Sequence, residues 1–100
     1  MEKRKPHYAL ERIKDQVAKA GIQAFTRTAL DGGALMGLLS TEMLATVLSV
    51  EQSMFHKSMT TYQDHRVWQD VYHVPTPMGV AYVKFTLRPD GAIVISFKRL

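Results

Sequence analysis

The segment from Lys57 to Tyr72 concentrates side chains that could bind an anionic polymer and act on it. It reads Lys57-Ser-Met-Thr-Thr-Tyr62-Gln-Asp-His65-Arg-Val-Trp68-Gln69-Asp-Val-Tyr72. Apolar core-builders are few in it, whereas hydrogen-bond donors, acceptors and aromatic rings are many. A lysine, a glutamine and three aromatic residues so close in sequence suit a site that grips a phosphate and stacks a base. The segment therefore predicts a nucleic-acid site.

RNA cleavage is within reach of such a side-chain set, and it needs no metal ion when the RNA's own 2′-hydroxyl attacks the adjacent phosphorus. The protein then has to hold the chain in line, assist two proton transfers and neutralise charge that grows on the phosphate. The chain has no Cys, and its four His lack a metal-ligand pattern such as i, i+4 with a carboxylate. We therefore expect neither a metal site nor a cofactor.

Composition indicates the class of protein and the charge of its partners. With 100 residues, 46% of them hydrophobic and 22% charged, the chain is expected to form one globular domain over residues 1–100. Thirteen Lys and Arg against nine Asp and Glu give a formal net charge of +4, which favours an anionic partner. No apolar run approaches the ~20 residues of a membrane span, so we expect a cytoplasmic protein without a membrane partner.

Helical periodicity dominates the first half of the chain. Leu10, Ile13 and Val17 recur at helical spacing and Gly21 supplies a stop, which predicts a helix over residues 7–20 with Pro6 at its start. Three further elements are expected: a short strand over residues 22–25, a weak helix capped by Thr26 or Thr28 and disturbed by Gly32-Gly33, and a helix over residues 41–49 with Ser40 as N-cap.

Alternation with a period near two takes over after about residue 52. Strands are expected over residues 66–73, 79–88 and 92–98, with a loop at Val74-Pro-Thr-Pro77 because proline removes ladder donors. Arg88-Pro-Asp-Gly91 suits a type I turn followed by a left-handed glycine. Helices followed by an antiparallel sheet make an α+β domain.

Hydrophobic patterning selects a register for the last two strands. One face would pair Leu87 with Ile93, Phe85 with Ile95, and Val83 with Phe97, all apolar as a buried face requires. The other face would pair Thr86 with Val94, Lys84 with Ser96, and Tyr82 with Lys98. Tyr82 and Lys98 are thus predicted to be direct neighbours on the polar face, away from the helices.

Strand alternation also sorts the aromatic residues of the central segment. Trp68 and Tyr72 alternate with Gln69, so a regular strand places them on the opposite face of the sheet. Trp68 is therefore predicted to lie in the core, and Tyr62, in the preceding loop, is the better candidate for stacking a base.

The central segment closely resembles the RNA-cleaving toxins called motility quorum-sensing regulators, MqsR. The resemblance extends to Met1-Glu-Lys-Arg-Lys-Pro-His7, Thr26-Arg-Thr-Ala-Leu30 and Val94-Ile-Ser-Phe-Lys98, in the right order and over nearly the whole chain. It implies the RelE-like small toxin fold, in which N-terminal helices pack on a twisted antiparallel sheet.

The resemblance also implies a function and its partners. The chain would be the toxin of a type II toxin–antitoxin pair, a metal-independent and ribosome-independent mRNA endoribonuclease that acts in growth control, stress and biofilm formation. It would cut single-stranded mRNA near GC-containing triplets such as GCU. Its partner would be an MqsA-like antitoxin with a zinc-binding N-terminal domain and a helix-turn-helix C-terminal domain. The alternative is a catalytically silent module that only binds RNA or the antitoxin.

The catalytic set of the family maps onto Lys57, Gln69, Tyr82 and Lys98, with all four residue types kept. Their donor inventory assigns phosphate binding to Lys57 and Lys98, and orientation of the phosphate or a base edge to Gln69. Tyr82, flanked by cations that favour the phenolate, is the candidate for proton transfer. Patterning alone would make these four solvent-facing polar residues on an open sheet.

Five further residues are candidates for RNA binding: His56, Met59, Tyr62, His73 and Lys84. Two of them depart from the family pattern, since His56 replaces a Tyr and His73 replaces an Arg. If that Arg contacts phosphate, His73 makes the contact titratable, and we expect activity to change between about pH 6 and 7. A tolerated surface exchange is the alternative explanation.

Overall fold

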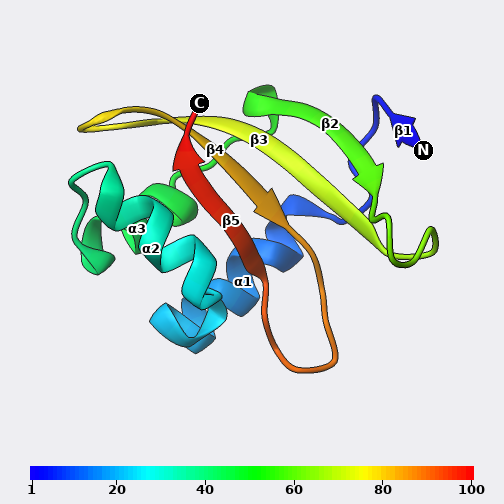
Figure 1. Ribbon diagram of the computed structural model, residues 1–100, viewed down its shortest axis with the longest axis horizontal. Helices are drawn as coiled ribbons and strands as arrows, with labels where there is room; N and C mark the ends of the chain where they lie inside the picture. The colour runs from blue at the N-terminus through cyan, green and yellow to red at the C-terminus, as the bar shows by residue number, and fades with distance from the viewer.

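Five antiparallel strands form one sheet in which the spatial order follows the chain, β1-β2-β3-β4-β5. The computed structural model describes residues 1–100. The strands are β1 (Glu2–Lys3), β2 (Phe55–Thr60), β3 (Trp68–Thr76), β4 (Gly79–Phe85) and β5 (Val94–Arg99). The short β1 lies at the edge beside β2, so the first residues of the chain lie next to a strand from its second half (Figure 1).

Three α-helices lie on one side of this sheet (Figure 1). They are α1 (Leu10–Ala20), α2 (Arg27–Leu35) and α3 (Ser40–Leu48), with 3-10 turns η1 (Gly21–Ala24) and η2 (Gln52–Met54). This arrangement confirms the α+β class, while the RelE-like assignment stays a prediction. None of the helices has the length and apolar character that crossing a bilayer would require.

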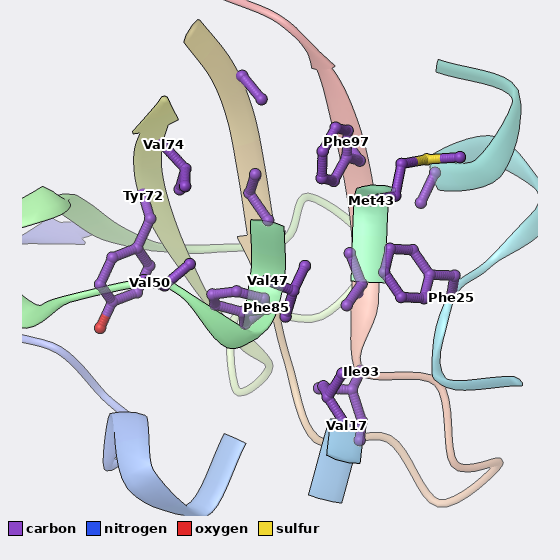
Figure 2. Packing of buried hydrophobic residues seen from close by; sticks show 14 of the residues in the cluster. Val17, Phe25, Met43, Val47, Val50, Tyr72, Val74, Phe85, Ile93 and Phe97 are labelled. Atoms are coloured by element: carbon purple, nitrogen blue, oxygen red, sulfur yellow. The ribbon is translucent and has the colours of Figure 1, made fainter. Parts of the chain in front are cut away.

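The core lies between the helices and one face of the sheet (Figure 2). Leu10, Ile13 and Val17 are buried, as their helical spacing predicted. Side chains of α3 and of the strands complete the cluster, among them Met43, Val47, Tyr72, Val74, Phe85 and Phe97. Burying this apolar surface is the main force that fixes the sheet against the helices.

The start of α1 and the segment after it differ from the prediction. The helix begins at Leu10 rather than residue 7, because the backbone N–H groups of His7 and Tyr8 donate to the Asp70 carboxylate instead of entering a helix. The strand predicted over residues 22–25 is the 3-10 turn η1, and only Phe25 pairs, in a parallel bridge with Val94.

The two later helices correct the expectations about their ends and interior. Thr26 is the N-cap of α2, its Oγ1 accepting from Ala29 N–H at 3.1 Å. The Gly32-Gly33 pair does not disturb this helix. A Cβ built on Gly32 would lie 2.1 Å from the carbonyl oxygen of Phe97, so glycine lets α2 pack directly on β5. The N-cap of α3 is Leu39, whose N–H donates to Glu42 Oε1 at 2.8 Å, and not Ser40.

β3 is longer than predicted and runs through the proposed loop at Val74-Pro-Thr-Pro77. Its pairing with β2 ends at Tyr72, and residues 73–76 pair with β4 alone. Pro75 therefore lies where β3 is an edge strand, and its missing N–H leaves no ladder bond unmade. β1 and β2 were not predicted, because neither shows a clear alternation of apolar and polar residues.

The register of β4 and β5 is confirmed next to the site and wrong beyond it. Tyr82 pairs with Lys98, Val83 with Phe97, and Lys84 with Ser96, as predicted. A bulge then pairs Phe85 with Val94 instead of Ile95, and Thr86 N–H donates to the Ile93 carbonyl. The expected pairs Phe85–Ile95, Thr86–Val94 and Leu87–Ile93 are therefore wrong. The turn is confirmed, with Gly91 N–H donating to the Arg88 carbonyl and Gly91 at φ 86°.

Candidate functional site

The four predicted catalytic residues come from four strands and share the sheet face that points away from the helices. Directly opposed residues of antiparallel strands lie on the same face, with Cβ atoms about 4.5–5.5 Å apart. One row across the sheet is His73, Tyr82 and Lys98, and the next is Lys57, Val71, Lys84 and Ser96. Met59 opposes Gln69 on the same face. Tyr82 and Lys98 are thus adjacent across β4 and β5.

Val71 forms the floor of this face. It is completely buried, although it lies on the side of the sheet that has no helices. Its neighbours in the row are Lys57 and Lys84, and the aliphatic stems of lysine side chains commonly cover apolar surface in this way. Lys57 and Lys84 thus flank a buried apolar residue, and charge interacts more strongly beside such a water-excluded patch than in bulk water.

Lys57, Lys84 and Lys98 crowd positive charge onto this face. The pKa of Lys84 is lowered from its usual value, first by partial burial and then by repulsion from Lys98 and Lys57. Such crowding raises the free energy of the empty face, and a bound phosphate would relieve it. The three lysines therefore form a cationic surface whose charge suits an anionic ligand.

Tyr82 lies among these cations, but its hydroxyl does not become a better proton acceptor. Partial burial raises the pKa of Tyr82 above its usual value and outweighs the opposing effect of Lys57. The charge of Lys57 favours the phenolate, as expected, but burial outweighs it and the net direction of the pKa shift is upward. Lys98 Nζ lies 5.3 Å and Lys84 Nζ 5.9 Å from the ring centroid, within the range of a cation–π contact. Tyr82 keeps its proton at neutral pH and can donate it.

Gln69 is oriented by a lysine of the neighbouring strand. Lys84 Nζ donates to Gln69 Oε1 at 3.4 Å. With its oxygen engaged in this way, the amide can present its NH₂ group to a phosphate oxygen or a base edge.

Glu2 is a residue of this face that sequence reasoning missed. It opposes Met59 across β1 and β2, and its Oε2 accepts from Lys57 Nζ at 2.9 Å. This hydrogen bond and the charge of Lys57 lower the pKa of Glu2. The opening motif Met1 to His7 marked this segment as similar to the family, but it carried no sign that Glu2 meets a lysine 55 positions away.

His56 and His73 form a stacked pair beside Tyr82. Their ring centroids are 4.2 Å apart with an interplanar angle of 24°, and His73 lies 6.2 Å from the Tyr82 ring. Partial burial, and then repulsion from His56, lowers the pKa of His73 from its ordinary value of 6.5. Its titration is therefore displaced towards acidic pH, and whether it alters activity stays a prediction.

The other RNA-binding candidates lie around a groove of about 360 Å³ at the β1 side of the face. Met59, Tyr62, Lys84 and Gln69 line it together with Met1 and Glu2. Tyr62 is fully exposed in the loop between β2 and β3, where it was expected, and its role in stacking a base stays a prediction. Its position at the rim would place a base next to the lysines.

Trp68 and Tyr72 lie on the opposite face from Gln69, as predicted, but only Tyr72 belongs to the core. Trp68 is partly exposed and is covered by the N-terminal segment. The His7 ring stacks on it at 5.3 Å, and Lys3 Nζ lies 4.0 Å from its centroid. The indole is therefore occupied by the protein's own side chains.

Side chains that could hold a metal ion are not gathered anywhere in the molecule, because no three His, Cys, Asp or Glu residues cluster in a suitable way. The chemistry available at the face is instead charge neutralisation by lysines and proton transfer by Tyr82, Glu2 or an imidazole.

Comparison with known proteins agrees with this chemistry. The family model described as "Motility quorum-sensing regulator, toxin of MqsA" matches residues 5–99. A protein of Escherichia coli (strain K12), named mRNA interferase toxin MqsR, is 41% identical over 98 residues, which cover 98% of each chain.

Proposed function

Because the chain belongs to the motility quorum-sensing regulator family of toxins, we propose that it is an mRNA interferase, an endoribonuclease that cuts single-stranded mRNA. The observation that carries the proposal is the convergence of Lys57, Gln69, Tyr82 and Lys98, from four strands, on one cationic sheet face. A protein with only a structural role would not need these partly exposed donors grouped around the buried Val71.

The proposed mechanism divides the work among these four residues. Lys57 and Lys98 hold the scissile phosphate and neutralise the charge that develops on it. Gln69 orients a phosphate oxygen or a base edge. Tyr82, kept protonated by burial, donates a proton to the departing 5′-oxygen while the RNA's own 2′-hydroxyl attacks phosphorus. The products are then a 2′,3′-cyclic phosphate and a 5′-hydroxyl.

The substrate and partner are proposed on the family resemblance together with the groove. A base stacked on exposed Tyr62 would lie beside Met59 and Gln69, which gives the site a place to read sequence near the cut. We expect cleavage near GC-containing triplets such as GCU, without the ribosome, on cytoplasmic mRNA. The proposed inhibitor is an MqsA-like antitoxin with zinc-binding and helix-turn-helix domains, and the proposed role is control of growth, stress response and biofilm formation.

The test is cleavage of a defined single-stranded RNA that contains one GCU triplet. The purified protein should give discrete fragments ending in a 2′,3′-cyclic phosphate, and EDTA should not reduce the rate. Lys57→Ala is the inactive control, because it lacks a phosphate-binding charge. It is purified in the same way, so any contaminating ribonuclease would be present in both samples. Cleavage no greater than that of Lys57→Ala would favour a silent binding module. Activity lost with EDTA and restored by metal would overturn the mechanism.

A further inference from the structure

The first eight residues are built into the sheet and do not form a free tail. β1 places Glu2 opposite Met59 and Lys3 opposite Ser58, and the Met1 carbonyl accepts from Thr60 N–H at 3.0 Å. The segment is therefore held in register along the edge of the proposed site.

A buried carboxylate anchors the other end of this segment. Asp70 is 1% exposed, and it accepts from the backbone N–H groups of His7 and Tyr8 at 2.9 Å and from Ser58 Oγ at 2.6 Å. The stack of His7 on Trp68 adds a second attachment. Fixed at both ends, the segment holds Glu2 over the open face.

Among the strand residues of that face, Glu2 provides the only side-chain carboxylate. The other side chains that the strand register places there are three lysines, one imidazole, one amide, two hydroxyls and four apolar groups: Lys57, Met59, Gln69, Val71, His73, Pro75, Val80, Tyr82, Lys84, Ser96 and Lys98. The Glu2 carboxylate hydrogen-bonds to Lys57, one of the two lysines assigned to the scissile phosphate.

We propose that Glu2 is the general base of the reaction, accepting the proton of the attacking 2′-hydroxyl; the inference rests on the proposed ribonuclease function. The bond from O2′ to phosphorus forms as the O2′ proton passes to the Glu2 carboxylate. The bond from phosphorus to O5′ breaks, and O5′ takes the proton of the Tyr82 hydroxyl. Exchange of both protons with water restores the enzyme, so no further reactant is needed.

The distances permit this assignment. An ammonium group has three donors, so Lys57 can bind Glu2 and a phosphate oxygen at once. With hydrogen bonds of about 2.8 Å on either side, the carboxylate and that phosphate oxygen lie at most ~5.6 Å apart. A 2′-hydroxyl poised for attack lies ~3–3.5 Å from phosphorus, so an RNA bound with this hydroxyl on the Glu2 side brings it within hydrogen-bond reach of the carboxylate.

The charged groups around Glu2 also favour Glu2 as the proton acceptor and Tyr82 as the proton donor. Lys57, Arg4 and the amino terminus keep Glu2 ionised, and Lys84 lines the same groove. The Glu2 charge in turn helps to raise the pKa of Tyr82, so the pair is set as base and acid. Glu2 is mostly exposed in its ion pair, with its side chain 58% accessible, so a substitution there leaves the core unchanged.

The experiment compares Glu2→Gln and Glu2→Asp with Glu51→Gln, a matched loss of one exposed carboxylate outside the site. Single-turnover cleavage of the GCU-containing RNA is measured against pH. Glu2→Gln should lose ~10²–10⁴-fold in rate at saturating RNA, the range of a general base, with little change in RNA affinity. It should also lose the fall in rate at acidic pH that protonation of Glu2 causes. Glu2→Asp should keep part of the rate, and Glu51→Gln all of it.

A second substrate separates the base from the acid. An RNA whose leaving 5′-oxygen is replaced by sulfur needs no proton donor, because a thiolate leaves without protonation. This RNA should restore cleavage by Tyr82→Phe but not by Glu2→Gln. Rescue of both variants, or a Glu2→Gln protein that cleaves normally or faster, would overturn the assignment while wild-type cleavage still supports the proposed function. Absence of wild-type cleavage would overturn both.

Discussion

Replacing Lys98 with Met tests whether one exposed charge is needed for the cleavage rate but not for the free energy of unfolding. Methionine keeps an unbranched apolar stem of similar length and removes the ammonium group. Lys98 is exposed, and its Nζ lies 5.3 Å from the centroid of the Tyr82 ring. Surface substitutions shift the free energy of unfolding by up to ~0.5 kcal/mol, and losing an exposed cation–π contact costs about 0.5–1 kcal/mol. The variant should therefore unfold within about 1.5 kcal/mol of the wild type.

The effect on rate should be much larger. An ammonium group 4 Å from a phosphate charge contributes about 4 kcal/mol at an effective dielectric constant near 20. Only the part that is stronger in the transition state than in the bound substrate accelerates the reaction. Loss of one such donor commonly reduces the rate ~10²–10³-fold, and we expect that range for Lys98→Met. The pKa of Lys84 should rise in the variant, because repulsion from Lys98 disappears.

The assay is single-turnover cleavage at saturating RNA, with urea unfolding of the same protein samples. Lys19→Met is the matched control, since it removes one positive charge from an exposed position of α1, on the other side of the sheet. It should retain the wild-type rate at saturating RNA. A fully active Lys98→Met protein would refute the role of this charge. An equal loss in Lys19→Met would show that net charge alone matters.

Three further substitutions test the site and its supports. The pKa of His73 is lowered from 6.5, so its imidazolium charge is present at acidic pH and is lost as pH rises. His73→Arg should therefore make the cleavage rate less dependent on pH, and His73→Ala should remove the gain in rate that the imidazolium gives at acidic pH. Unchanged pH–rate profiles would contradict this. Gly32→Ala should lower unfolding free energy by about 1–3 kcal/mol in urea titrations, because its Cβ would meet the Phe97 carbonyl oxygen at 2.1 Å. Asp70→Asn should speed amide exchange at His7 and Tyr8, measured by hydrogen exchange, because a carboxylate acceptor is lost.

Features set by local chemistry could be predicted from the sequence. Leu10, Ile13 and Val17 identified the buried face of α1, since helical spacing depends on neighbours within one segment. The glycine turn at Gly91 fixed the hairpin closely enough to place Tyr82 beside Lys98. The bulge before Phe85, which pairs Phe85 with Val94, was not predicted, because a bulge depends on packing in the core and leaves no local pattern in the sequence.

Features that depend on distant pairing could not be predicted. β1 is only two residues long, and its partner strand lies more than fifty positions away. The ion pair of Glu2 with Lys57 and the anchoring of His7 by Asp70 both follow from that pairing. Asp70 lies on the helix-facing side of the sheet, and the backbone N–H groups of His7 and Tyr8 are the donors that satisfy its buried carboxylate. The family resemblance could therefore propose the lysines, glutamine and tyrosine of the candidate site, and it gave no sign of the carboxylate beside them.

The electrostatics of the open face link its stability to its proposed activity. Partial burial, and then repulsion from Lys98 and Lys57, lowers the pKa of Lys84, and Glu2 supplies a compensating charge through its ion pair with Lys57. A phosphate bound between Lys57 and Lys98 would supply the missing negative charge where Glu2 does not reach. The charge that grows on phosphorus during attack would be stabilised further by the same repelling cations, which need no reorganisation to meet it. Repulsion among these lysines raises the free energy of the protein when no RNA is bound. The same charges would stabilise the transition state more than the bound RNA.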